Sequence, residues 1–470
     1  MAGKHTLERL IQWSMRGPWA DRFDEILADH VLPACDETGL GMEDIVSTIG
    51  EDLFMSTVWA CAFEDFLTCE FGDGENAIDD YLKRRGWKET ASVRTYMAAL
   101  RSSTMSLYEV SDIVPGTSFH ARDLIRGGEP VLISERSATR SLKPWDRIAA
   151  RVVQVGSKMQ VGGGVLVFEH GTAEDILEAW DAFEKLGKDQ RRRFAKDALG
   201  EDVDDEAIAD LSPTEMARTS GSLFTTFWLV DLIDRIREPS IPDWRNSEGD
   251  ELVLCEVRYP LAAGTTSNDI RTVLHAHAEF CTADMITWNW ITGEKPAAAG
   301  AGEQPGRSLN FETWRDDGAL VLGDVKLEDK AVVLSTNSRQ RSDRGDALLS
   351  RILGSRVGEP SIKTETVEQI MASRDAGEPQ AVDISEEEQF AIIHGQMDRH
   401  YRSVLDEPVA VLGGLTPRAA VKTDDGRVKV VEWLKMMENM TAKSGDDNSA
   451  MASYDFGWLW RELGLGELRR

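Results

Sequence analysis

The chain has 470 residues, of which 41% are hydrophobic and 29% are charged, a balance typical of a globular protein with several cores. Its formal net charge of −29 disfavours nucleic-acid partners, because such proteins gain much of their affinity from cationic side chains. The longest apolar runs are too short to span a bilayer, and the first residues lack the apolar core of a signal peptide. We therefore expect a cytoplasmic protein of roughly two to four domains, with no membrane partner.

The first part of the chain, residues 1–105, favours a helical domain. Apolar side chains recur at helical spacing from Leu7 to Met15 and again from Ile45 to Trp59. Aromatic residues at this spacing are typical of a helix-bundle core rather than of a cofactor site. The five cysteines form no CxxC pair, which favours reduced thiols.

Residues 106–170 change to short apolar runs separated by Gly and Pro, and this pattern predicts a small antiparallel β-barrel. Gly162 to Gly164 lack the spacing of a phosphate-binding loop, so we interpret them as a hairpin turn between two strands. The range is locally basic, so a nucleic-acid-associated factor that uses the barrel stays open as an alternative. The candidate nucleic-acid contacts are Arg122, Arg126, Arg136, Arg140, Lys143, Arg147 and Arg151.

The middle of the chain predicts a helical segment over residues 171–240 and a mixed domain over residues 251–357, with a linker from Pro239 to Asp250. The mixed domain shows the order β-α-β, loop, β-β-α, for which we expect a two-layer α+β sandwich. Its last helix is predicted from Arg339 to Leu353, with Ser338 as the N-cap. An unrecognised enzyme in this domain stays open as a second alternative.

No catalytic or metal-binding motif is recognisable in the sequence. His275 and His277 are two residues apart on a predicted helix, so their side chains point to different faces. His394 and His400 are six residues apart and miss the spacing of a helical zinc motif. No serine or cysteine stands in a nucleophile motif. We predict no catalytic residue, no metal and no cofactor.

Residues 385–470 favour a compact helical module that contains the most distinctive motif of the chain, LGGLTP at Leu412 to Pro417. The two glycines permit a sharp turn, Thr416 is a candidate N-cap, and Pro417 fits the first position of a helix. A longer helix is predicted to follow from Arg427 to Asn439, with Val428, Val431 and Leu434 facing inward.

This region resembles the toxin-binding domain of the MbcA/ParS/Xre antitoxin family, over about residues 395–440. The family has a Leu-Gly-Gly-x-Thr-Pro turn, a short helix, a Thr-x-x-Gly turn and a helix with spaced Val and Leu. These features match LGGLTP, Ala419-Ala420, Thr423 with Gly426, and Val431 with Leu434. The resemblance implies docking to a protein partner, typically a RES-type toxin that consumes NAD.

The chain also departs from such antitoxins, because other architecture precedes the module, no DNA-reading helix is visible, and a tryptophan-rich helix follows. The candidate partner-binding residues are Leu412, Gly413, Gly414, Thr416, Pro417, Arg418, Trp458 and Trp460. Our leading hypothesis is a non-enzymatic, multidomain protein-interaction protein of the α+β class. It joins an N-terminal helical region, a small barrel, an α+β domain and a C-terminal antitoxin-like module.

Overall fold

The computed structural model divides the chain into two compact units. Unit 1 comprises Met1–Pro239 together with Ile384–Arg470, and unit 2 comprises Ser240–Asp383. The C-terminal helices therefore belong to the same unit as the N-terminal half, although unit 2 separates them in the sequence. The structure describes residues 7–72, 74–186, 190, 221–237, 243–246, 248–292, 308–311, 319–366, 369, 386–444 and 449–469.

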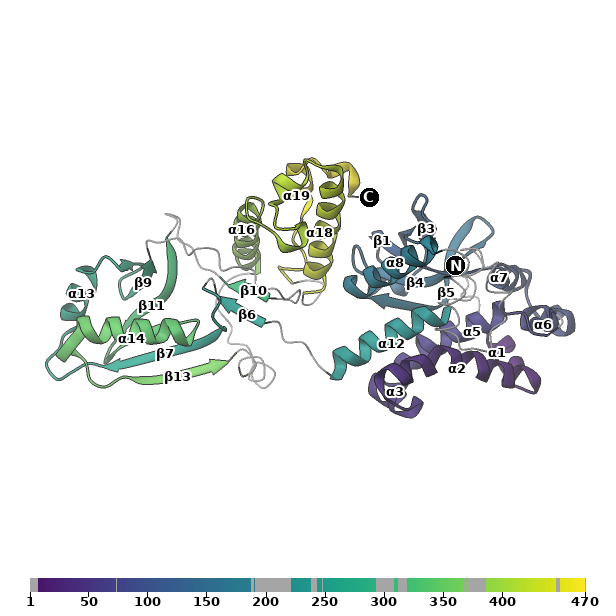
Figure 1. The fold of residues 1–470 in the computed structure, drawn as a ribbon, viewed down its shortest axis with the longest axis horizontal. Coiled ribbons are helices and arrows are strands. Elements are labelled where there is room, and N and C mark those ends of the chain that lie inside the picture. The colour runs from purple at the N-terminus through teal and green to yellow at the C-terminus, as the bar shows by residue number, and fades with distance from the viewer. Residues whose placement is uncertain are drawn as a thin grey trace. The chain divides into compact units, whose positions relative to one another are not determined.

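The N-terminal part of unit 1 is helical, as predicted (Figure 1). Aromatic rings fill its core, where Phe23 packs against Phe63 and Phe66 with ring centroids 5.7 and 5.6 Å apart. The helices are α1 (Glu8–Ser14), α2 (Pro18–Thr38), α3 (Met42–Ile49), α4 (Glu51–Ser56), α5 (Val58–Thr68), α6 (Ala77–Arg85), the short η1 (Gly86–Lys88) and α7 (Ala91–Arg101).

The predicted barrel is confirmed as a closed five-stranded barrel with the order β1-β2-β3-β5-β4. Every neighbouring pair is antiparallel except β3 and β5, which run parallel. Val110, Phe119 and Ile133 lie in its fully buried interior. The strands are β1 (Met105–Val114), β2 (Ser118–Asp123), β3 (Val131–Ser134), β4 (Arg147–Val155) and β5 (Lys158–Phe168), with η2 (Ala138–Arg140) between β3 and β4.

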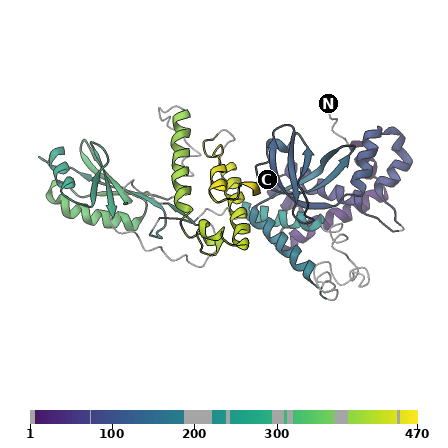
Figure 2. The ribbon, with the colours of Figure 1, turned by 90° about the horizontal axis from the view of Figure 1, so that it is seen from above.

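Helices cover one outer face of the barrel (Figures 1 and 2). Leu107, Ala149 and Leu166 point outward from the barrel into a core shared with α2, α5 and α12 (Gly221–Arg237). The strand β5 leads into α8 (His170–Lys185), which joins the same core. The predicted helical segment after the barrel is represented by α8 and α12, and most of the residues between these two helices lie outside the described part of the chain.

The predicted hairpin at Gly162 to Gly164 is wrong, because these residues lie inside β5 where α5 crosses the strand. A Cβ atom on Gly162 would lie 2.4 Å from a carboxylate oxygen of Glu64. A Cβ on Gly164 would lie 2.6 Å from the sulfur of Cys61. The glycines therefore permit a helix and a strand to approach closely, which is a known use of glycine within a strand.

The close approach buries the carboxylate of Glu64, which accepts a hydrogen bond from the backbone N–H of Gly163. Burial raises the pKa of Glu64 to about 7, although the backbone bond and the nearby Arg151 oppose the rise. Next to it, Asp65 forms an ion pair with Arg151 and a contact of 3.3 Å with His30. Charged groups thus lie between the helices and the barrel.

Unit 2 is a two-layer α+β structure, as predicted. A six-stranded antiparallel sheet has the order β13-β7-β12-β11-β9-β8, and a separate two-stranded parallel sheet pairs β6 with β10. The strands are β6 (Asp243–Asn246), β7 (Val253–Pro260), β8 (Phe280–Thr282), β9 (Thr287–Thr292), β10 (Ser308–Phe311), β11 (Leu320–Glu328), β12 (Ala331–Thr336) and β13 (Ser361–Thr366). The helices are α13 (Ser267–His275), α14 (Arg339–Leu353) and the short η3 (Gly354–Arg356).

The helices α13 and α14 pack on the six-stranded sheet of unit 2. Side chains alternate between buried and exposed along β7, and the buried Val257 joins Ile270 of α13 and Leu349 of α14 in one core. The helix predicted from Arg339 to Leu353 is confirmed at both ends.

The C-terminal part of unit 1 is a helical module with a core that includes Leu405, Trp433 and Phe456. Its elements are α16 (Glu386–Val404), η4 (Ala410–Leu412), α17 (Pro417–Ala420), α18 (Asp424–Ala442), α19 (Gly457–Glu462) and η5 (Gly466–Leu468). Across the residues that the structure describes, no helix combines the length and the apolar character needed to cross a membrane.

The buried Glu64 makes stability depend on pH. The folded protein holds a proton on Glu64 more tightly than the unfolded chain, where the pKa is 4.5, so this group destabilises the fold as the pH rises from 4.5 to about 7. Glu64→Gln keeps an oxygen acceptor for Gly163 and removes the charge. We expect the variant to gain stability over the wild type between about pH 5 and about pH 7.5 in urea denaturation.

Glu129→Gln, at an exposed position near β3, is the control and should show no such gain. An equal pH dependence for Glu64→Gln and the wild type would contradict the assignment.

Candidate functional site

The LGGLTP motif forms the turn that its residues predict. Gly413 and Gly414 have φ angles of 70° and 74°, in the left-handed region that favours glycine. The hydroxyl of Thr416 accepts a hydrogen bond of 3.2 Å from the N–H of Ala419, and Pro417 is the first residue of α17. The local geometry of the motif is therefore explained by a turn and a helix cap.

Several predicted contact residues of the module are buried within it. Trp460 is fully buried, so the prediction that it contacts a partner from the surface is wrong. Leu412 and Pro417 are also buried. Trp458 is half-buried, and its indole donates a 2.8 Å hydrogen bond to the hydroxyl of Tyr454. The side chain of Arg418 is 42% exposed and forms ion pairs with Asp406 and Glu462 at 3.2 and 2.8 Å.

The helix α18 is buried along two faces. One face places Val430, Trp433 and Leu434 in the module core. The second face buries charged and amide groups, including Lys435 and Glu438, against the barrel. Because two faces are occupied, Val428 points to solvent with 64% of its surface exposed, contrary to the prediction that it faces inward.

A cluster of four charges joins α18 to the barrel. Glu109 of β1 and Arg147 of β4 are cross-strand neighbours, and their side chains are 3.2 Å apart. The ammonium of Lys435 donates to both carboxylate oxygens of Glu109, at 2.7 and 2.9 Å. Glu432 completes the cluster by pairing with Lys435 at 3.3 Å and with Arg147.

The cluster contains two cations and two carboxylates, so its formal charges cancel. The nearby cations also affect the pKa of Glu432. Burial alone would raise the pKa of Glu432, but Lys435 and Arg147 together hold that pKa below its ordinary value. Isolated charges would be costly at such a site, whereas paired and hydrogen-bonded charges are tolerated there.

A second set of contacts places two indoles on one carboxylate. Trp145 precedes β4, and its indole donates a 2.6 Å hydrogen bond to Glu438, while Trp460 donates one of 2.5 Å to the same group. Asn439 donates bonds of 2.8 Å to the carboxylate of Asp146 and to the carbonyl of Pro144. The segment before β4 is therefore fixed to α18.

Trp145 also has a φ angle of 67°, a conformation that is rare for a bulky residue. Such backbone strain costs on the order of 1–3 kcal/mol and persists only where surrounding contacts hold it. Here the backbone N–H of Trp145 donates to the carbonyl of Val110, and the indole bond to Glu438 fixes the side chain.

Two of the predicted nucleic-acid contacts are wrong, because they are buried in ion pairs. Arg147 is neutralised by Glu109 and Glu432. Arg151 pairs with Asp65 and donates 2.7 Å to the carbonyl of Ser103.

The other five predicted contacts are more accessible. Arg126 pairs with Asp123 at 3.0 Å, Lys143 is half-buried, and Arg136 and Arg140 are exposed. Arg122, the last of the five, lines a pocket at the junction of the barrel and the module.

This pocket, which we call the junction pocket, has a volume of about 340 Å³ and is lined by the barrel and by the C-terminal module. Arg122 comes from the barrel, Val428 and Val431 from α18, and Leu468 from η5. Charged side chains of both signs surround these apolar groups, namely Asp424, Arg427, Glu432, Lys435 and Glu467. The sequence did not indicate that the barrel and the module would share a pocket.

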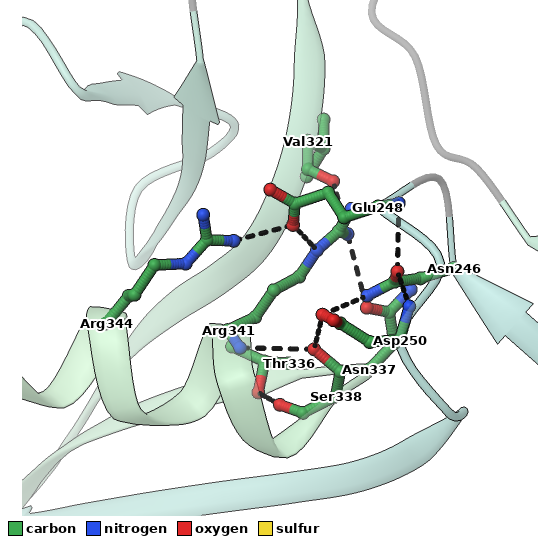
Figure 3. A network of polar contacts seen from close by, with 9 residues as sticks. All are labelled: Asn246, Glu248, Asp250, Val321, Thr336, Asn337, Ser338, Arg341 and Arg344. Atoms are coloured by element: carbon green, nitrogen blue, oxygen red, sulfur yellow. Dashed lines mark hydrogen bonds and ion pairs between the residues drawn. The ribbon is translucent and has the colours of Figure 1, made fainter. Parts of the chain in front are cut away.

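In unit 2, the polar residues between β12 and α14 form a connected network (Figure 3). Ser338 caps α14, as predicted, by accepting a 3.1 Å bond from the N–H of Arg341, and its hydroxyl donates to Asp250 at 2.9 Å. Arg341 is only 1% exposed and donates to Glu248 at 2.8 Å and to Asn337 at 3.2 Å.

The network holds part of the segment predicted as a linker, which is therefore not a free connection. The side-chain oxygen of Asn246 accepts bonds of 2.9 and 3.0 Å from the N–H groups of Glu248 and Asp250. Because these polar groups satisfy one another, the network supports a structural role at the start of α14. Within the described ranges, the structure contains no group of three or more His, Cys, Asp or Glu side chains suited to hold a metal ion.

Removal of the Lys435 ammonium should loosen the module. Lys435→Ala leaves Glu109 buried with Arg147 alone, and we expect a loss of about 2–3 kcal/mol in the free energy of unfolding. Urea denaturation measures this loss, and hydrogen exchange should become faster in α18 and β1.

Lys429→Ala provides a control on the same helix, since Lys429 forms an exposed pair with Asp425. It should cost less than about 1 kcal/mol. Equal effects of the two substitutions would refute a special role for Lys435.

Arg341→Lys should destabilise the start of α14, because an ammonium does not reproduce the forked contacts of a guanidinium. We expect a cost of about 1–3 kcal/mol and faster hydrogen exchange in α14 and in residues 248–250. Arg344→Lys is the matched control, since the half-exposed Arg344 contacts the same carboxylate of Glu248 at 2.6 Å. Unchanged exchange in Arg341→Lys would exclude this role.

Comparison with protein families gives a match to part of the chain. Residues 57–196 are similar to a family of unknown function, DUF7986. The matched range runs from the start of α5 through the barrel and past α8, and includes neither the C-terminal module nor unit 2. No curated protein and no solved structure matches the chain.

Proposed function

We propose that this chain is a cytoplasmic, non-enzymatic protein-interaction protein whose junction pocket binds a protein partner. The observation that carries the proposal is the exposed apolar centre of this pocket. Val428 and Leu468 are 64% and 45% exposed, and both line a concave site between two substructures. Apolar side chains inside a charged rim are the usual anatomy of a protein-binding site.

The rim favours a protein over a polyanion. Three cationic and three acidic side chains surround the apolar centre, so the pocket has no excess of positive charge. A phosphate-rich ligand would meet Asp424, Glu432 and Glu467, which repel it. A protein surface with its own charges of both signs fits such a rim better.

A toxin of the RES type is the first partner that we propose. The resemblance to the MbcA/ParS/Xre toxin-binding domain suggests it, and the turn at Gly413 and Gly414 with the Thr416 cap supports that resemblance. The contact surface differs from the one expected from the sequence, because the predicted contact residues Leu412, Pro417 and Trp460 are buried. We place the contact at Val428 and the residues around it.

The barrel contributes directly to this proposed site. Since Lys435 and Glu438 are engaged by the barrel, the corresponding face of α18 is closed to a partner. A partner at Val428 would meet Arg122 of β2 as well as the module. In this proposal the C-terminal module needs the barrel, because the barrel supplies part of the surface that a toxin would contact.

The test is co-expression of the chain with RES-type toxins. We expect the tagged full-length chain to co-purify with a toxin and to relieve its effect on growth. Val428→Asp should weaken the complex at least about tenfold, because it places a charge in an apolar contact.

Met285→Asp, at a residue of unit 2 that is 80% exposed, is the matched control and should bind normally. Failure of the wild-type chain to bind any of these toxins, or full binding by Val428→Asp, would refute the proposal.

A further inference from the structure

A second pocket, which we call the arginine pocket, lies among the N-terminal helices α1, α2, α6 and η1, and has a volume of about 620 Å³. Its lining includes only two acidic side chains, Glu75 and Asp80. The cationic lining residues are Arg9, Arg16, Arg22, Arg84, Arg85 and Lys88. A local excess of positive charge is notable in a chain whose net charge is −29.

The two acidic residues neutralise only part of this charge. Glu75 pairs with Arg22 at 2.8 Å, and Asp80 pairs with Arg84 at 2.6 Å. Arg16 and Arg85 are exposed and have no carboxylate partner in the part of the chain that the structure describes. Charges without partners on a concave surface attract an anion from solution.

Rigid aromatic side chains support the pocket wall. Trp19 is 8% exposed, its indole donates 3.1 Å to Asp80, and the guanidinium of Arg22 lies 4.6 Å from its ring centroid. Tyr81 is fully buried, and the ring of Trp13 packs against it at 5.3 Å. Arg22 and Arg84 are therefore held in place before a ligand arrives, which lowers the entropy cost of binding.

The backbone adds to the positive potential. The 21-residue helix α2 begins at Pro18, immediately after Gly17 at a φ angle of 63°, and has no side-chain cap. Pro18 and Trp19, in its first turn, line the pocket. The N-terminal end of a helix carries partial positive charge and unpaired N–H groups, both of which favour an anion.

We propose that the arginine pocket binds a small molecule with several phosphate groups. Guanidinium groups form paired hydrogen bonds with phosphate oxygens, and several of them in one pocket suit several phosphates. The volume lies in the range of pockets that hold nucleotide-sized ligands. A compact ligand meets only the local positive charge, whereas a long nucleic acid would also meet the acidic remainder of the chain.

Titration calorimetry on the full-length chain tests this proposal with inorganic tripolyphosphate and with ATP as separate probes. We expect at least one probe to bind, with an affinity that falls as salt is added. Arg16→Glu/Arg85→Glu should weaken that affinity by about 100-fold or more, since it replaces two charge-assisted contacts with repulsion. Because both residues are exposed, we expect the variant to fold, and circular dichroism would check this.

The matched control is Lys158→Glu/Lys330→Glu, which reverses two exposed cations outside the pocket and should bind as the wild type does. Tighter binding of ATP than of tripolyphosphate would assign a contact to the nucleoside, and equal binding would assign recognition to the phosphates alone. Absence of binding by both probes at millimolar concentration, or undiminished binding by Arg16→Glu/Arg85→Glu, would overturn the proposal. Tighter binding of a single-stranded oligonucleotide than of ATP would also overturn it, in favour of nucleic acid.

Discussion

The burial of Glu109 between Lys435 and Arg147 is the constraint on which unit 1 depends. A carboxylate on the outer face of a barrel strand is ordinarily solvated, but here α18 covers it. Covering it without a cation would be costly, and Lys435 supplies that cation from a distant part of the sequence. The barrel and the C-terminal helices therefore form one body, and the barrel face at β1 and β4 is complete only when α18 lies on it.

The position of α18 determines the proposed site. Because the helix is fixed on one side by its core residues and on another by Lys435 and Glu438, its remaining surface presents Val428. The strained backbone of Trp145 and the shared carboxylate of Glu438 fix the same contact from the barrel side. The exposure of Val428 in the junction pocket is therefore set by polar contacts within the protein, which fix α18 against the barrel.

Local signals explain the part of the fold that could be predicted. Short apolar runs separated by Gly and Pro predicted the barrel. The N-cap Ser338 and the helical pattern after it predicted both ends of α14 correctly. The LGGLTP turn was predictable because glycine, threonine and proline each act on their own backbone or on that of a near neighbour. Such effects require no knowledge of distant residues.

Distant contacts explain what could not be predicted. Lys435 and Glu438 occur in a polar helical pattern that is typical of a solvated face, and only the barrel reveals that they are buried. Gly162 and Gly164 resemble turn residues until α5 crosses them. The arginine pocket draws its cations from three separate helices and their connections, so no short motif indicates it.

The insertion of unit 2 within unit 1 also has a consequence for synthesis of the protein. Domains tend to fold as they leave the ribosome, with the N-terminal part first. The barrel strands are complete at Phe168, whereas Lys435 and Glu438 emerge only after all of unit 2 has been made. During that interval Glu109, Arg147 and Trp145 face water on the nascent chain. We therefore expect the last helices to complete the assembly, and a chain that ends before α18 would expose the barrel face that α18 covers in the finished protein.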